Sequence, residues 1–279
     1  MDLIQSLKAS KILASFKEKT KGMGFNLALF ILISLFLLIL IFPIASLFLK
    51  ITPEEFVRSL SEPVVVDAMI LSLITATIST IIVITLGTPL SYVNARVKYK
   101  GRAIIDTLTD LPIVLPPAVA GLALLMAFGR KGVLGSYLDL FGIQLAFTTV
   151  AVVLAQVFVA SPFYIRQARA SFEAVDPIYE NAAKTLGASK VQVLMKITIP
   201  IASSGLVSGA ILTFARALGE FGATLMFAGN YQGKTQTMPL AIYTTMQSNM
   251  YDAISLAIIL VVISFAVIMT VKYVTKREI

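Results

Sequence analysis

Two charged residues, Arg216 and Glu220, interrupt an otherwise apolar stretch of the sequence. They lie four positions apart, so on a helix they share one face and can form an ion pair. A charge inside a membrane span is costly and faces the protein interior or a wet cavity. The pair therefore indicates either a polar lining that handles an anion or a structural ion pair that fixes helix packing. We take both residues as candidates for a translocation path.

Other residues that carry chemistry are scarce. The 279 residues include no Cys and no His, which excludes a disulfide framework, a Cys/His metal site and any Ser-His or Cys-His nucleophile pair. We expect no catalytic residue and no metal site. Without paired carboxylates in its apolar stretches, the chain also gives little support to an intramembrane enzyme.

A second unusual stretch reads Leu-Pro-Ile-Val-Leu-Pro-Pro and ends with Pro116 and Pro117. Its three prolines predict extended or broken backbone, which membranes tolerate only where protein or water surrounds it. The alternative is a simple helix start at the membrane interface. Pro116 and Pro117 are therefore further path candidates. Gly205 and Gly209 form a small-xxx-small pattern, which favours close contact between two helices.

The elements that carry these residues are membrane helices. Apolar residues make up 57% of the chain and charged residues only 14%, against about a quarter charged in a soluble domain. The apolar residues fall in six stretches, each long enough for the roughly 20 residues of a transmembrane helix. These stretches are 22–49, 68–95, 111–129, 140–165, 197–233 (interrupted by the charged pair) and 253–271.

The sequence thus predicts an all-α polytopic membrane protein with six transmembrane helices. Segment 22–49 has no charged residue and is longer than the apolar region of a signal peptide, so we expect it to remain as an anchor.

The basic residues predict the orientation. Of the 23 Lys and Arg residues, seventeen fall on the side of the N- and C-terminal segments and five on the other. By the positive-inside rule, both termini are cytoplasmic. The net charge of +8 then follows from topology and indicates no nucleic-acid partner. Segment 1–21 is either an amphipathic helix on the anionic lipid surface or a disordered basic tail.

The most informative part is the long cytoplasmic loop 166–199. Asp176 is a good helix N-cap, and Pro177 suits the first helical position. Gly187 is placed to end this short helix, because it accepts the left-handed conformation. Ser189, with Gln three residues later, forms a capping box that starts a second helix. Pro200 is expected to kink that helix.

The product is a helix–turn–helix that a soluble partner could bind, although from geometry alone it could equally be an ordinary loop. The segment resembles the cytoplasmic signature of ATP-binding-cassette (ABC) importer permeases: Glu-Ala-Ala, three residues, Gly, nine residues, Ile-x-Leu-Pro. Five residues match in type and spacing, namely Ala182, Ala183, Gly187, Ile197 and Pro200. Asn181 stands where the signature has Glu, with Glu180 one residue earlier, and Ile replaces Leu at 199.

This resemblance covers residues 66–271 and implies a type I importer fold. It implies that Asp176, Glu180, Asn181 and the five matching residues couple the chain to a separate cytoplasmic ATPase. The sequence contains no phosphate-binding loop, so the resemblance puts ATP and Mg on that partner and no cofactor on this chain. It further implies a homodimer of permeases, two ATPases, an extracytoplasmic binding protein, and alternating access in the cell membrane. Residues 272–279 are expected to form a cytoplasmic tail.

The resemblance to importer permeases also implies a substrate class. Segments 214–230 and 234–243, and the proline-rich stretch before Leu124, resemble molybdate permeases. Sulfate permeases are similar but tend to carry Tyr where this chain has Phe221. The resemblance favours molybdate, with tungstate inseparable because the two ions have nearly the same size, shape and charge. Sulfate or thiosulfate transport is the alternative, followed by an ion-gradient-driven secondary transporter, which would favour internal repeats that the sequence does not show.

Overall fold

The computed structural model describes residues 26–27 and 29–276. The chain divides into two compact units, residues 1–50 and 51–279. All secondary structure among the described residues is helical, as the composition predicted. The predicted amphipathic segment 1–21 lies outside the described residues.

The first unit contributes one described apolar helix, Leu29–Leu49. Its 21 residues extend over about 31 Å at 1.5 Å per residue, which matches the hydrocarbon core of a bilayer. Large apolar side chains such as Phe30 and Phe42 are exposed around it, as expected of a helix whose surroundings are lipid or other membrane helices.

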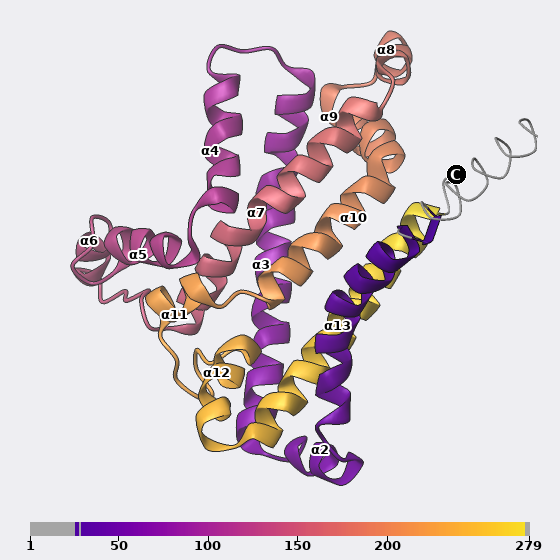
Figure 1. The fold of residues 1–279 in the computed structure, drawn as a ribbon. Helices are drawn as coiled ribbons and strands as arrows, with labels where there is room; N and C mark the ends of the chain where they lie inside the picture. The colour runs from indigo at the N-terminus through magenta and orange to yellow at the C-terminus, as the bar shows by residue number, and fades with distance from the viewer. Residues whose placement is uncertain (1–25, 28, 277–279) are drawn as a thin grey trace, which may run out of the picture. The chain divides into compact units, whose positions relative to one another are not determined.

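The second unit holds the remaining described helices (Figure 1). They are, in chain order, α2 (Pro53–Ser59), α3 (Pro63–Arg96), α4 (Arg102–Val114), α5 (Pro117–Phe128), α6 (Gly135–Asp139), α7 (Thr149–Ala174), α8 (Pro177–Thr185), α9 (Lys190–Val193), the π-helical turn η1 (Leu194–Thr198), α10 (Ile199–Leu218), α11 (Gly222–Ala228), α12 (Met238–Ser248) and α13 (Met250–Lys276).

Small polar side chains join α3 to α7. Ser79 Oγ donates to Gln156 Oε1 at 2.9 Å, and Gln156 Nε2 donates to Thr75 Oγ1 at 3.2 Å, with all three residues buried. Farther along, Ser91 Oγ donates to the carbonyl of Ile165 at 3.1 Å. In lipid, hydrogen bonds between polar side chains of neighbouring helices stabilise helix association. These hydrogen bonds therefore hold α3 against α7.

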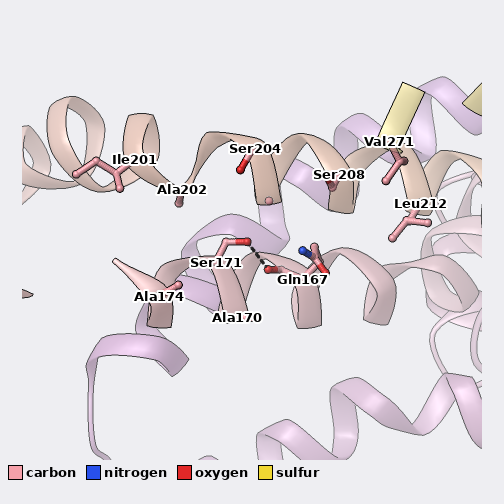
Figure 2. Close-up of a pocket in the computed structure, with 11 residues that line it drawn as sticks. Gln167, Ala170, Ser171, Ala174, Ile201, Ala202, Ser204, Ser208, Leu212 and Val271 are labelled. Carbon is pink, nitrogen blue, oxygen red and sulfur yellow. Dashed lines mark hydrogen bonds between the residues drawn. The ribbon is translucent and has the colours of Figure 1, made fainter. Parts of the chain in front are cut away.

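Helices α7 and α10 approach closely where the small-xxx-small pattern predicted helix contact. A Cβ added at Gly205 of α10 would collide with Ser171 Oγ of α7, and one at Gly209 would lie 3.1 Å from Gln167 Cβ. Both glycines are therefore required for the present spacing of the two helices. Figure 2 shows Ser171 and Gln167 on α7 across from Ser204 on α10. A cavity of about 450 Å³ beside this contact is lined by both helices and by Val271 of α13.

The predicted third span is broken rather than straight. Helix α4 begins at Arg102, includes Pro112, and ends at Val114, and the chain then turns by 117° into α5. The break falls at Leu115 and Pro116, whose extended backbone (ψ 132° and 135°) cannot continue a helix. Of the two alternatives for this stretch, broken backbone is the one observed, and α4 and α5 together can form one bent span.

The predicted fifth span is also divided. Helices α9, η1 and the start of α10 are bent by 75° against the rest of α10, next to the predicted kink at Pro200. Helix α10 ends at Leu218, and α11 follows after a short break, so the helix does not continue to residue 233. Among the described residues, four helices are long and apolar enough to cross a membrane, or up to six if each bent pair forms one span.

The second unit has two opposite ends (Figure 1). Helix α8 and the turn between α3 and α4 lie at one end, and α2 and the turn between α12 and α13 lie at the other. The basic segments 96–102 and 184–196 belong to the α8 end. The positive-inside prediction therefore assigns the α8 end to the cytoplasm.

Candidate functional site

Helix α8 has defined ends, as its sequence predicted. Asp176 Oδ1 accepts the Ile178 N–H at 2.9 Å, so Asp176 is the N-cap, and Pro177 occupies the first helical position. At the other end the Gly187 N–H donates to the Lys184 carbonyl, and the next N–H donates to the Ala183 carbonyl, both at 3.0 Å. These two bonds form a Schellman motif. Gly187 has φ +86°, the left-handed conformation that a glycine adopts without strain.

A second helix begins two residues after this turn. The Ser189 hydroxyl accepts the Gln192 N–H at 3.3 Å, and the Gln192 side chain accepts the Ser189 N–H at 2.8 Å. This is the predicted capping box. The chain then passes through η1 into α10 with the 75° bend near Pro200. We call residues 175–198, from the end of α7 to the end of η1, the coupling loop.

The coupling loop is shorter than the predicted loop 166–199, because α7 continues to Ala174. Sequence reasoning ended the span at Arg166, where charged residues begin. In the structure Arg166 pairs with Asp110 at 2.6 Å, and Arg169 pairs with Asp106 at 2.8 Å and with Glu173 at 2.9 Å. Ion pairs with α4 thus let α7 extend by two further turns. Sequence analysis did not identify the two pairs with α4, because their partners lie about 60 positions apart in the sequence.

The outer face of the coupling loop carries an exposed apolar surface. Leu186 is 87% exposed, and Ile178, Tyr179 and Val191 are exposed as well. Contiguous exposed apolar side chains commonly mark an interaction site. If the α8 end faces the cytoplasm, as the positive-inside rule predicts, such a surface fits a soluble partner better than lipid.

The predicted coupling residues divide into outward and inward groups. Exposed residues are Asp176, Asn181, Ala182, Gly187 and Pro200, whereas Ala183 and Ile197 are partly buried. Glu180 is the exception, because it is buried at 4% exposure.

Glu180 makes its bonds inside the chain. Its Oε1 accepts from Arg96 Nε at 3.0 Å and from Thr198 Oγ1 at 2.9 Å. In this structure Glu180 is therefore turned away from the exposed face, and Asn181 occupies that face in its place. Arg96 and Thr198 were missed by sequence reasoning, and no local pattern in the sequence signals their role.

The predicted pair of Arg216 and Glu220 is present, with Arg216 Nη1 2.9 Å from Glu220 Oε2. Glu220 lies beyond the end of α10, in the break before α11, rather than on the same helix. Its Oε1 accepts the Ala223 N–H at 2.8 Å. The Glu220 side chain is 2% exposed and that of Arg216 is 30% exposed. Glu220 therefore supports both the Arg216 guanidinium and the start of α11.

Arg216 also lines a cavity of about 130 Å³ next to the break between α4 and α5. The opposite wall includes Pro112 and Pro117, and Val159 and Phe163 of α7 complete it. The structure thus brings together the charged pair and the proline-rich stretch, which the sequence marked separately. Pro116 sits at the break itself and is exposed.

Close packing holds the start of α11 against α5 beside this cavity. A Cβ on Gly222 would lie 2.5 Å from Pro117 Cβ, and one on Gly121 would lie 2.6 Å from Met226 Cβ. Contacts this short cannot form without displacing one helix. The position of Arg216 relative to Pro117 therefore depends on these two glycines.

Among the described residues, no group of three or more Asp, Glu, His or Cys side chains is arranged to hold a metal ion. The residues that line the cavity supply one guanidinium, that of Arg216, and an otherwise apolar wall, while Glu220 pairs with Arg216 without lining the cavity. Such a site can contact an anion but has no nucleophile or acid–base pair.

Residues 84–277 match the family described as binding-protein-dependent transport system inner membrane component. The chain is 40% identical over 272 residues to the probable transport system permease protein NifC of Clostridium pasteurianum, covering 95% of each chain. It is 41% identical over 229 residues to the molybdenum transport system permease protein ModB of Mycobacterium tuberculosis, covering 82% of this chain and 87% of that one.

A sulfate relative and a solved structure extend this comparison. The chain is 34% identical over 235 residues to the sulfate transport system permease protein CysT of Salmonella typhimurium, covering 83% of this chain and 85% of that one. The crystal structure of a bacterial ABC transporter involved in the import of the acidic polysaccharide alginate matches with a TM-score of 0.73 over 94% of this chain and 98% of that chain. Its sequence identity is 16%, so this is a likeness of fold.

Together the family match, the relatives and the fold agree with the expected type I importer architecture and with a location in the membrane. The chain belongs to the binding-protein-dependent inner-membrane transport components, the permease subunits of ABC importers, in which ATP hydrolysis resides on a separate subunit.

Proposed function

We propose that this chain is the permease of an importer that moves molybdate or tungstate into the cell. Two copies would form the translocation pathway, with one ATPase docked on each coupling loop. An extracytoplasmic oxyanion-binding protein would bind on the opposite face. ATP and Mg would bind on the ATPases, and this chain would carry no cofactor. The observation that carries the importer part is the capped helix α8 with its exposed apolar face.

The docking role follows from rigidity and exposure together. A Schellman motif at one end and an N-cap at the other hold α8 in one conformation before a partner arrives. Preorganisation reduces the entropy lost on binding. The exposed Leu186, Ile178 and Tyr179 would enter a groove on the ATPase, where their burial would supply the affinity. ATP-driven closure of the two ATPases would then alternate the permease between inward-open and outward-open states.

The cavity at Arg216 suits brief contact with an oxyanion. A lone guanidinium in a low-dielectric site would hold a dianion strongly, and conduction requires that an ion can also leave. Glu220 at 2.9 Å offsets the charge of Arg216. The pair would therefore attract the anion weakly enough for release, while it also keeps α11 in place.

The identity of the anion rests on the relatives. Relatives named for molybdenum transport reach 41% identity, and those named for sulfate transport reach 35%. Phe221, rather than Tyr, adjoins Glu220, which also favours molybdate. Sulfate or thiosulfate is the second candidate because the sulfate relative covers 83% of this chain.

The stimulation of ATP hydrolysis by loaded binding protein tests both the docking role and the identity of the anion. The permease would be reconstituted in liposomes with its ATPase subunit, and binding protein carrying molybdate, tungstate or sulfate would be added in turn. We expect hydrolysis to rise with molybdate or tungstate and not with sulfate. A response to sulfate alone would refute the substrate assignment, and failure to form a stable complex with any ATPase would refute the docking role.

A further inference from the structure

Helix α8 has one carboxylate that does not face the proposed partner. Glu180 is 4% exposed, whereas its neighbours Tyr179 and Asn181 are exposed. A buried carboxylate is unfavourable unless charged or polar partners stabilise it. The side chains that donate hydrogen bonds to Glu180 belong to other helices. This arrangement indicates that Glu180 links α8 to those helices.

These partners come from both sides of the coupling loop. Arg96, the last residue of α3, donates from Nε to Glu180 Oε1 at 3.0 Å and from Nη2 to the Val175 carbonyl at 2.7 Å. Thr198, the last residue of η1, donates to the same Oε1 at 2.9 Å. One guanidinium and one carboxylate thus join the end of α3, the end of α7, α8 and the turn that leads into α10.

Other attachments of α8 are local. The helix packs chiefly on α9 and η1, which belong to the coupling loop itself. Its bond to Arg96 is a direct side-chain link from α8 to α3. Helix α3 in turn packs along α7, α10 and α12, so a displacement of its end is passed to most of the second unit.

We propose that Arg96, Glu180 and Thr198 form a joint that transmits movement of the docked ATPase to the membrane helices. This inference rests on the proposed docking function. A docking helix held only by its own loop would shift without moving the spans. Through the joint, a displacement of α8 acts on α3 by way of Arg96 and, by way of Thr198, on η1 and the bend near the start of α10. Helix α10 carries Arg216 near its other end, so the joint connects the docking surface to the cavity.

Charge-assisted hydrogen bonds suit this task because they are short and directional. Both strong bonds converge on one oxygen of Glu180, whereas Lys184 lies 3.8 Å from the other oxygen. A neutral amide at position 180 would keep the shape of the side chain but lose the ion pair. Glu180→Gln therefore isolates the link without changing the exposed face of α8.

The test compares Glu180→Gln with Glu173→Gln, a matched control that neutralises an ion-paired carboxylate near the end of α7, outside the coupling loop. The complete transporter would be assembled from each permease in liposomes. Three quantities would be measured: affinity for the ATPase, stimulation of ATP hydrolysis by loaded binding protein, and anion uptake per ATP. We expect Glu180→Gln to keep its affinity for the ATPase, while stimulation and uptake per ATP fall by about 2- to 30-fold, the range of single-residue effects on coupling between sites. Glu173→Gln should retain both the stimulation of ATP hydrolysis and the uptake per ATP.

A second variant separates transmission from mere stability. The chain has no Cys, so an Arg96→Cys, Glu180→Cys double variant can be cross-linked selectively with a short bis-maleimide. The cross-link replaces the ion pair by a covalent tie, and we expect it to restore coupling that the unlinked double variant lacks. A purely structural role predicts loss of ATPase binding in parallel with coupling, without rescue by the cross-link.

The outcomes distinguish the joint from the docking function. Normal coupling in Glu180→Gln and in the unlinked double variant, with a normal wild-type complex, would refute the joint alone. Loss of coupling that the cross-link does not restore would also refute it. Absence of any complex between the wild-type permease and the ATPase would refute the docking function, and the joint with it.

Discussion

Gly187 offers the sharpest test of the coupling loop. Its φ of +86° lies in the left-handed region, and a Cβ added there would meet nothing within 4 Å. The Cβ of a substituted valine therefore meets no neighbour, and we expect the main effect to fall on the backbone. The left-handed conformation costs an L residue roughly 1–2 kcal/mol, and a β-branched residue fits it poorly.

We expect the free loop of Gly187→Val to relax out of this conformation and to regain it on docking. Because 1.4 kcal/mol corresponds to a factor of ten, the affinity for the ATPase should fall by about 5- to 30-fold. Gly187→Asn should retain more of the affinity, since asparagine tolerates the left-handed region.

A matched control is available in Gly142, which has φ +71° and no neighbour within 4 Å of an added Cβ. It follows α6, away from α8 (Figure 1). Gly142→Val should impose a similar backbone strain but leave ATPase affinity unchanged. Affinity would be measured by titrating the ATPase onto immobilised permease in lipid nanodiscs. Wild-type affinity in Gly187→Val, or equal weakening in Gly142→Val, would refute the reasoning.

Three further predictions concern the cavity, the packing beside it and the orientation. Arg216→Ala should lower anion uptake at least about tenfold with the ATPase complex intact, because Glu220 is left buried without its countercharge; unaltered uptake would remove Arg216 from the path. Gly121→Val should lower stability by about 1–3 kcal/mol through overpacking against Met226, seen as an earlier thermal transition, and an unchanged transition would contradict the close packing. A cysteine at Arg102 should react with a membrane-impermeant maleimide only from the cytoplasmic side, and labelling from outside would reverse the topology.

Local signals predicted the coupling loop well. The N-cap at Asp176, the stop at Gly187 and the capping box at Ser189 each depend on residues within a few positions of one another, and each is found in the structure. Such interactions are encoded by short sequence patterns, so they are readable without knowledge of the rest of the fold.

Long-range partners set the features that the sequence did not predict. Glu180 was assigned to the coupling face together with its neighbours, and only its contacts with Arg96 and Thr198 show that it points inward. The extension of α7 past Arg166 likewise depends on Asp110, which lies on another helix. The positions of the spans could be predicted from the length of the stretches without charged residues. Those stretches could not show that ion pairs between α4 and α7 would let α7 continue past its uncharged part.

The breaks in the spans were partly predictable. Three prolines signalled irregular backbone before α5, but the 117° turn there is set by the packing of α5 on α11 through Gly121 and Gly222. Those glycines carry no distinctive local pattern. Their role becomes visible only when both helices are placed together.

Uptake of molybdate into proteoliposomes tests the central claim most directly. Vesicles would contain the permease and its ATPase, with ATP enclosed in the lumen and molybdate-loaded binding protein outside, and internal molybdenum would be measured by mass spectrometry. The account predicts uptake that requires enclosed ATP, the ATPase and the binding protein, and that survives the collapse of ion gradients by ionophores. Uptake by the permease alone, independent of ATP and abolished by ionophores, would contradict it.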